Sequence, residues 1–280
     1  MIRGMRLAFV KMHGLGNDFL IFDADSAAAL PGAAQLRALA DRHTGVGFDQ
    51  ALALAPPRRT GTAVYYRVFN ADGSEAEQCG NGARCVAALI AQRLGQRTGA
   101  VQLDSPAGLV EAQIRGGGQV SVAMGVPDFA PQALPFVAAA EAPLYALEVG
   151  GQTLNIGAVS VGNPHAVLRV AAVADAAVDS LGPAVENHAR FPRRTNVGFM
   201  EIVSRAAVRL RVHERGVGET HACGTGAVAA VAVGRRNGWL DASVAVELPG
   251  GRLDVEWHDA ASPIWLTGPT AIAFEGHADL

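Results

Sequence analysis

The chain contains Cys79-Gly-Asn-Gly-Ala83 and, 144 positions later, Cys223-Gly-Thr-Gly-Ala227, and each segment opens a run of small apolar residues. The two runs predict helices over 82–94 and 226–236. A helix that is apolar on nearly every side is buried. We therefore expect each helix to form the centre of its own domain, wrapped by the strands of that domain.

Further short matches support an internal duplication. They are Thr44-Gly-Val-Gly-Phe48 with Thr195-Asn-Val-Gly-Phe199, Gly16-Asn17 with Gly162-Asn163, and Arg67-Val68 with Arg211-Val212. A single match means little in a chain with 33 glycines. Several matches in the same order and at offsets of 144 to 151 are typical of two homologous halves.

Most of the remaining pattern predicts strands. The segment 207–213 alternates apolar and polar residues, as a half-buried strand does. Similar segments predict strands over 64–69, 109–114, 120–124, 244–248, 253–257 and 271–274, and a helix is predicted over 33–42.

The domain boundaries follow from the duplication. We expect an N-terminal half of residues 1–123 that is completed by a returning strand in 269–280, and a C-terminal half of residues 124–268. Four prolines between Pro127 and Pro143 mark the expected linker, because proline disfavours regular structure.

The bulk composition excludes several classes of protein. Of the 280 residues, 50% are hydrophobic and 18% charged, which excludes disorder, and a net charge of −3 without a basic stripe argues against nucleic-acid binding. The most apolar segment, 222–234, is too short to span a bilayer, so no membrane partner is expected. The apolar stretch before Lys11 has only four residues, which is too short for a signal peptide, so we expect a cytoplasmic protein. Met1 and Met5 are both candidate start residues.

Three cysteines, with spacings of 6 and 138, form neither a disulfide framework nor a metal motif. We expect free thiols, no metal, and Cys85 as a buried helix residue. Cys79 and Cys223 each precede a helix N-terminus, where free N–H groups and the helix dipole favour anions. The loops are therefore expected to lower the thiol pKa and to cradle a carboxylate. Two thiols on opposite sides of one carbon suit the inversion of a stereocentre.

Several longer segments carry more specific information. They are Lys11-Met-His-Gly-Leu-Gly-Asn-Asp-Phe19, Gly47-Phe-Asp-Gln50, Phe69-Asn-Ala-Asp-Gly-Ser-Glu-Ala-Glu-Gln-Cys-Gly-Asn-Gly-Ala-Arg-Cys85, Gly162-Asn-Pro-His165, Asn196-Val-Gly-Phe199 and Glu214-Arg-Gly-Val-Gly-Glu-Thr-His-Ala-Cys-Gly-Thr-Gly-Ala227. These segments closely resemble diaminopimelate epimerases. The resemblance implies an α/β (α+β) fold of two pseudo-symmetric domains, each a curled, mainly antiparallel sheet around a central apolar helix. It also implies the interconversion of LL- and meso-diaminopimelate, in lysine and peptidoglycan precursor synthesis, without pyridoxal phosphate or any other cofactor, and a homodimer.

The same resemblance implies roles for individual residues. Cys79 and Cys223 are the expected catalytic thiolate and thiol, and His165 and Glu214 are expected to tune the thiol pKa. Glu214 and Arg215 are expected to bind the ammonium and carboxylate at the distal end of the substrate. The other expected substrate-binding residues are Asn17, Gln50, Asn70, Gly80, Asn81, Asn163, Asn196, Gly224 and Thr225.

Other readings remain open. A proline or hydroxyproline racemase shares the two-thiol plan, but it has no use for the charged pair Glu214-Arg215. A thiol oxidoreductase or redox sensor would need a Cys79–Cys223 disulfide for activity, and a binding protein would hold diaminopimelate without exchanging its α-proton. His213 and His221 stand near the second thiol, and we expect both to face the surface with no effect on it.

Overall fold

The computed structural model describes residues 6–26, 29–76 and 79–280. The candidate start residues Met1 and Met5 lie outside the described residues. The chain forms two compact units: unit 1 is Met1–Val122 with Gly268–Leu280, and unit 2 is Ala123–Thr267.

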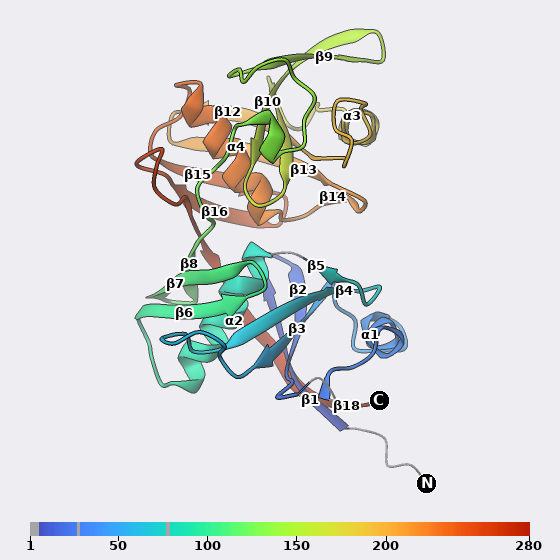
Figure 1. Ribbon diagram of the computed structural model, residues 1–280, viewed down its shortest axis with the longest axis vertical. Helices are drawn as coiled ribbons and strands as arrows, with labels where there is room; N and C mark the ends of the chain where they lie inside the picture. Colours follow the sequence, from blue (N-terminus) through green and yellow to red (C-terminus); the bar gives the residue numbers. More distant parts are fainter. Residues whose placement is uncertain (1–5, 27–28, 77–78) are drawn as a thin grey trace. The chain divides into compact units, whose positions relative to one another are not determined.

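Unit 1 is a curled, mainly antiparallel sheet that carries the helices α1 and α2 (Figure 1). The strands pair in the order β18–β1–β2–β3–β4–β6–β7–β8, and β5 extends β4. Only the pairs β2–β3 and β4–β6 are parallel. The elements are β1 (Arg6–Gly14), β2 (Asn17–Asp23), α1 (Ala33–Ala40), β3 (Gln50–Ala55), β4 (Tyr65–Asn70), β5 (Glu75–Ala76), α2 (Gly80–Arg93), β6 (Gly99–Ser105), β7 (Gly108–Gly116), β8 (Gln119–Ala123) and β18 (Ala271–Asp279).

Unit 2 repeats this topology element by element. Its strands pair in the order β9–β10–β11–β12–β13–β15–β16–β17, with β14 on β13, and again only two pairs are parallel, β11–β12 and β13–β15. The elements are η2 (Pro131–Ala133), β9 (Tyr145–Val149), β10 (Gln152–Ser160), β11 (Pro164–Val170), α3 (Val178–Glu186), β12 (Asn196–Ser204), β13 (Ala207–Glu214), β14 (Gly218–Thr220), α4 (Gly224–Arg236), β15 (Ser243–Leu248), β16 (Gly251–Glu256) and β17 (Trp265–Pro269). The expected fold class is confirmed.

A matched ion pair marks the duplication at atomic detail. The guanidinium of Arg67 on β4 donates to both carboxylate oxygens of Glu75 at 2.8 Å. The guanidinium of Arg211 on β13 does the same with Glu219, at 2.6 and 2.7 Å. Such a fork fixes two side chains in one orientation. It ties β4 to the loop strand β5, and β13 to β14, directly ahead of the two thiol segments.

The helices α2 and α4 are the buried centres of their units. In unit 1, α2 packs against β1, β2, β6 and β7, and in unit 2, α4 packs against β10, β11, β12, β13 and β16. Small residues allow this close packing. A Cβ on Gly157 of β10 would lie only 2.3 Å from Cγ1 of Val233 on α4, so the strand can cross the helix only where it has no side chain.

The structure differs from the sequence analysis in two places. The proline-rich segment 127–143 is not a linker but part of unit 2, where Phe136 packs its ring 4.6 Å from that of Phe191 and 4.8 Å from that of Tyr145. Helix α3 has no counterpart in the sequence analysis. Along the described part of the chain, no helix has the length and apolarity needed to cross a membrane.

Candidate functional site

Each unit carries one thiol at the start of its buried helix. Cys79 is the N-cap residue of α2, and its Sγ accepts a hydrogen bond from the N–H of Gly82 at 3.3 Å. Cys223 is the N-cap residue of α4, and its Sγ accepts from the N–H of Gly226 at 3.3 Å. Both sulfurs therefore take the place that a Ser, Thr or Asp oxygen usually fills. We call the surroundings of Cys79 and Cys223 the first and second half-sites.

The glycine three positions after Cys223 is required by space. A Cβ on Gly226 would lie 3.2 Å from Sγ of Cys223 and 2.8 Å from Cγ2 of Val212. Contacts below 3.0 Å force the structure to shift. The spacing Cys-Gly-x-Gly thus lets the helix begin against the sulfur and a neighbouring strand.

In the first half-site, the amide of Asn17 contacts Asn81, Asp49 and the thiol of Cys79. Its Oδ1 accepts from Nδ2 of Asn81 at 3.1 Å and lies 3.9 Å from Sγ of Cys79. Its Nδ2 donates to the carboxylate of Asp49 at 2.9 Å. The amide of Asn17 is therefore held with its oxygen toward the thiol.

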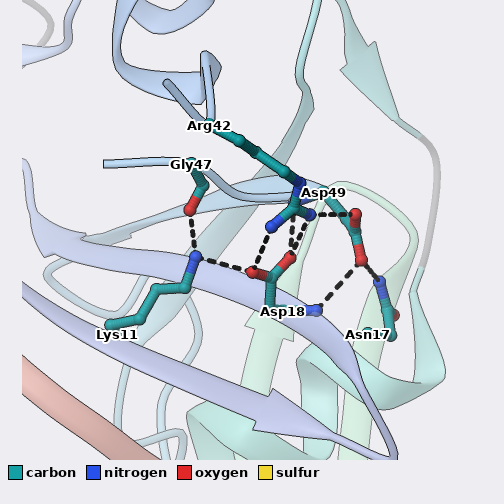
Figure 2. Close-up of polar contacts among 6 residues, drawn as sticks. All are labelled: Lys11, Asn17, Asp18, Arg42, Gly47 and Asp49. Atoms are coloured by element: carbon teal, nitrogen blue, oxygen red, sulfur yellow. Dashed lines mark hydrogen bonds and ion pairs between the residues drawn. The ribbon is translucent and has the colours of Figure 1, made fainter. Parts of the chain in front are cut away.

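A network of ion pairs holds Asp49, the residue that orients Asn17 (Figure 2). The guanidinium of Arg42 bridges the carboxylates of Asp18 and Asp49, at 2.8 and 2.7 Å. Lys11 pairs with Asp18 at 2.7 Å and donates to the carbonyl oxygen of Gly47. Burial opposes the charge on Asp18, but hydrogen bonds from Arg42 and Lys11 outweigh it and hold the pKa of Asp18 well below its usual value. The network holds Asp49 in place to orient Asn17.

The other expected residues of the first half-site stand at strand and helix ends. Nε2 of Gln50, at the start of β3, donates to Oδ1 of Asn70, at the end of β4, at 3.1 Å. Nδ2 of Asn70 donates to Oγ of Ser74 at 3.1 Å. Gly80 is the buried first residue of α2.

In the second half-site, a polar chain leads from the thiol into the core. Oγ1 of Thr225 lies 3.5 Å from Sγ of Cys223 and accepts from Nδ2 of Asn163 at 3.5 Å. Oδ1 of Asn163 lies 3.0 Å from Nε2 of His165. Burial, together with the positive charge of Arg215, lowers the pKa of His165 to about 3, so its ring is neutral. A neutral ring carries no charge, and its link to the thiol is the chain of contacts through Asn163 and Thr225.

Asn196 positions the loop that follows β13. Its Nδ2 donates to the carbonyl oxygen of Pro164 at 3.1 Å, and its Oδ1 accepts from the backbone N–H of Arg215 at 2.9 Å. Oε1 of Glu214 accepts from the hydroxyl of Thr220 at 2.5 Å. Gly224 is the buried first residue of α4. The charged pair is thus anchored beside the second thiol.

The expectation of a lowered thiol pKa is wrong for Cys223. Its residue is only 3% exposed, and burial together with the negative charge of Glu214 raises its pKa well above the ordinary value. The hydrogen bonds from Thr225 and from the N–H of Gly226 act in the opposite direction but are outweighed. In this structure Cys223 is therefore a thiol and not a thiolate at neutral pH.

His213 is not at the surface, contrary to expectation. It is 7% exposed, and its Nε2 lies 2.8 Å from the carboxylate of Glu186 on α3. Glu186 also accepts from the N–H of Gly216 at 2.9 Å and pairs with Arg194 at 3.3 Å. This carboxylate ties α3 to the loop after Arg215. His221, in contrast, is exposed as expected.

Cys85 is confirmed as a buried helix cysteine: it has no exposed surface, and burial raises its pKa to about 12. All three cysteines are free thiols. Within residues 6–26, 29–76 and 79–280, no three His, Cys, Asp or Glu side chains gather as ligands for a metal ion. Sequence reasoning missed the contacts of Asp49 and Glu186, whose partners Asn17 and His213 are distant along the chain. It also missed the contact of Arg84 with Asn81, one helical turn away.

Comparison with known proteins gives the family. Residues 9–130 and 157–272 match the family model described as diaminopimelate epimerase. Among curated relatives, the diaminopimelate epimerase of Stutzerimonas stutzeri is 50% identical over 276 residues, covering 99% of this chain and 100% of the relative. That of Pseudomonas syringae pv. tomato is 48% identical with the same coverage.

Solved structures with low sequence identity share the fold. A probable proline racemase from Agrobacterium radiobacter superposes with a TM-score of 0.70 at 16% identity, covering 98% of this chain and 93% of the other. A hydroxyproline epimerase from Agrobacterium vitis gives the same TM-score and coverage at 18% identity.

Proposed function

The chain belongs to the diaminopimelate epimerase family and is an isomerase, and we propose that it interconverts LL- and meso-2,6-diaminopimelate with Cys79 and Cys223 as its two acid/base groups. The observation that carries the proposal is the matched capping of the two sulfurs, each held at 3.3 Å by the third N–H of a buried helix. This arrangement presents two equivalent proton carriers, one from each half of a duplicated fold.

The proposed reaction moves two protons and forms no bond between substrate and enzyme. One sulfur, as thiolate, takes the proton from the α-carbon and becomes a thiol. The other, as thiol, gives its proton to the opposite face of the same carbon and becomes a thiolate. The carbon is inverted, the total charge is unchanged, and the reverse reaction uses the thiols in exchanged roles.

The carbanionic intermediate is the energetic problem, because we propose no pyridoxal or other cofactor to delocalise its charge. Gly80, Asn81, Gly224 and Thr225 form the first turns of α2 and α4, where the backbone N–H groups point to the positive end of the helix. We propose that they bind the reacting carboxylate and stabilise the negative charge that spreads onto it.

The remaining site residues are proposed to select the substrate. Diaminopimelate carries a second amino-acid end, for which Glu214 offers a carboxylate to the ammonium and Arg215 a planar fork to the carboxylate. Asn17, Gln50, Asn70, Asn163 and Asn196 are proposed to supply amide hydrogen bonds. His165 and Glu214 are proposed to tune Cys223, the first through Asn163 and the second by its charge.

Closure of the two units around the substrate is part of the proposal, since a carbanion needs a site without water. The chain passes between the units at residues 122–123 and 267–268, and these crossings replace the proline-rich segment as the proposed hinge. A scattering profile that does not change when substrate binds would contradict closure. A cytoplasmic location, a homodimer, and a place in lysine and peptidoglycan precursor synthesis are proposals that follow from family membership.

The test is proton exchange at the α-carbon. The reduced protein is incubated without cofactor in D2O with pure LL-diaminopimelate, and the α-proton is followed by NMR. We expect meso product with deuterium at the inverted carbon, loss of this activity in Cys79→Ala and Cys223→Ala, and retention in Cys85→Ala. Absence of exchange with diaminopimelate but exchange with proline would support a proline racemase instead. Activity that appears only in the oxidised protein would support a redox function.

A further inference from the structure

The loop between β13 and β14 carries Arg215 and needs support from outside the hairpin. It consists of residues 215–217, and the N–H of Val217 donates to the carbonyl oxygen of Glu214 at 3.0 Å, which closes the turn. Strand β14 has only three residues, Gly218–Thr220, so few ladder bonds hold it on β13. A short two-stranded hairpin is marginally stable by itself. The position of Arg215 therefore depends on contacts with other elements.

Two side chains from other elements hold consecutive backbone N–H groups of this loop. Oδ1 of Asn196, the first residue of β12, accepts from the N–H of Arg215 at 2.9 Å. Oε1 of Glu186, the last residue of α3, accepts from the N–H of Gly216 at 2.9 Å. Asn196 thus fixes the peptide group before Arg215, and Glu186 fixes the peptide group after it.

The carboxylate of Glu186 is itself held in one orientation. The residue is buried, and its Oε2 lies 2.8 Å from Nε2 of His213 on β13. Its Oε1 also accepts from Nη1 of Arg194 at 3.3 Å. The ring of His213 fills the space beside Gly182 of α3, where a Cβ would lie 2.6 Å from Cγ of that ring. With contacts at both oxygens, the carboxylate ties the N–H of Gly216 to α3 and to β13.

Glu186 does not neutralise the guanidinium of Arg215. None of the ion pairs among the residues that the structure describes includes Arg215, and its Nη1 donates to the carbonyl oxygen of Arg193 at 3.3 Å. The positive charge of Arg215 lies close enough to the second half-site to lower the pKa of His165. This leaves the guanidinium available for the distal carboxylate that the proposed function assigns to it.

The duplicated fold contains the same kind of contact in unit 1. Helix α1 follows β2 and precedes β3, as α3 follows β11 and precedes β12. Nη1 of Arg37 on α1 donates to the carbonyl oxygen of Asp72 at 3.2 Å. Asp72 precedes Gly216 by 144 positions, the same offset that separates the two catalytic cysteines. In both units, therefore, this helix holds the same position of the hairpin, by a donor in unit 1 and by an acceptor in unit 2.

We propose that Glu186 is a positioning residue for Arg215 and holds its guanidinium where it binds the distal carboxylate of the substrate. Glu186 acts through the N–H of Gly216 and contacts no reacting atom. The inference rests on the function proposed above and adds to it a residue outside the expected site. The step that depends on Glu186 is substrate binding, and not proton transfer at the two sulfurs.

The first test needs no substrate. Amide hydrogen exchange of the reduced, unliganded protein is followed by mass spectrometry in peptides that cover residues 214–220. Glu186→Met removes the acceptor at nearly the same side-chain length, and we expect the loop to exchange about ten-fold faster. Glu186→Gln keeps an oxygen for the N–H of Gly216 and should stay close to the parent rate. Parent-like exchange of the loop in folded Glu186→Met would overturn the proposal, whether or not the protein is an epimerase.

The second test separates binding from chemistry. With LL-diaminopimelate, Glu186→Met should raise KM by about ten-fold and change kcat by a smaller factor, and Glu186→Gln should stay close to the parent KM. In an Arg215→Met background, Glu186→Met should raise KM little further, because the contact that it removes acts through Arg215. Equal effects of Glu186→Met on KM in both backgrounds, or a loss of kcat alone, would overturn the proposal.

A control variant measures the effect of lost stability alone. Leu253→Ala on β16 truncates a fully buried side chain of unit 2 and destabilises the unit by leaving a cavity. We expect it to leave KM and the exchange of residues 214–220 at parent values. If it raises KM as Glu186→Met does, lost stability explains both results and the proposal fails. If the parent protein does not turn over diaminopimelate, the proposed function fails, and the exchange of the loop still decides the role of Glu186.

Discussion

Gly226 is the position where the second thiol segment has least room, and replacing it by alanine gives a prediction with a matched control. The added Cβ would lie 2.8 Å from Cγ2 and 3.2 Å from Cγ1 of Val212, and 3.2 Å from Sγ of Cys223. Val212 is β-branched and stiff, so relief requires a shift of β13 or of the helix. Overpacking of this kind costs about 1–3 kcal/mol.

The equivalent change in unit 1 meets softer neighbours. A Cβ on Gly82 would lie 3.3 Å from Cδ2 of Leu52 and 3.5 Å from Cβ of Cys79, and the tip of a leucine side chain can move by tenths of an ångström. Alanine also gains up to about 1 kcal/mol over glycine in a helix. We therefore expect Gly82→Ala to change the free energy of unfolding by about zero, and Gly226→Ala to lower it by about 1–2 kcal/mol.

Urea unfolding followed by far-UV circular dichroism measures both variants, and tryptophan fluorescence reports on unit 2, which contains all three tryptophans. Adding Val212→Ala to Gly226→Ala removes the closest contact, so the two changes should couple favourably by about 0.5–3 kcal/mol. Equal stability of Gly226→Ala and Gly82→Ala, or additive effects in the double variant, would refute the argument from space.

Three further predictions concern charge. Glu214→Gln should lower the pH at which iodoacetamide alkylation of Cys223 is half-maximal, because the carboxylate of Glu214 raises the pKa of that thiol and the substitution removes this effect; an unchanged profile in peptide mass spectrometry would contradict this. Glu186→Ala should cost on the order of 3 kcal/mol in urea unfolding, because His213 and two other donors lose their buried acceptor. Asp18→Asn should destabilise the protein at pH 7 but less below about pH 4, since a depressed folded-state pKa stabilises above the unfolded pKa and the benefit is lost as pH falls; a pH-independent difference would argue against it.

The central helices and most strands could be predicted from the sequence because their patterns are local. The apolar runs predict α2 and α4, which begin two residues earlier than expected, at Gly80 and Gly224. Helix α3 could not be predicted, because Gly182 and Pro183 within it oppose a helix. Its glycine is explained only in three dimensions: a Cβ there would lie 2.6 Å from the ring of His213.

The expected site residues came from motifs, whereas their supports depend on contacts between distant segments. Asp49 meets Asn17 across 32 residues of sequence, and Glu186 meets His213 across 27. The pKa of the Cys223 thiol could not be predicted from the sequence for the same reason. A helix N-terminus is visible in the sequence, but the burial of Cys223 and the direction of Glu214 are not, and here they outweigh the helix end.

Because β18 belongs to unit 1, the two units are completed at different stages of translation. Unit 2 is one continuous stretch of chain, whereas unit 1 needs β18 to pair with β1, from Arg6 with Asp279 to His13 with Ala271. Because the ribosome makes the chain from its N-terminus, β1 has an unpaired edge throughout the synthesis of unit 2. The unit that is translated first is therefore completed last, and the newborn chain must keep one strand edge from aggregating until its partner emerges.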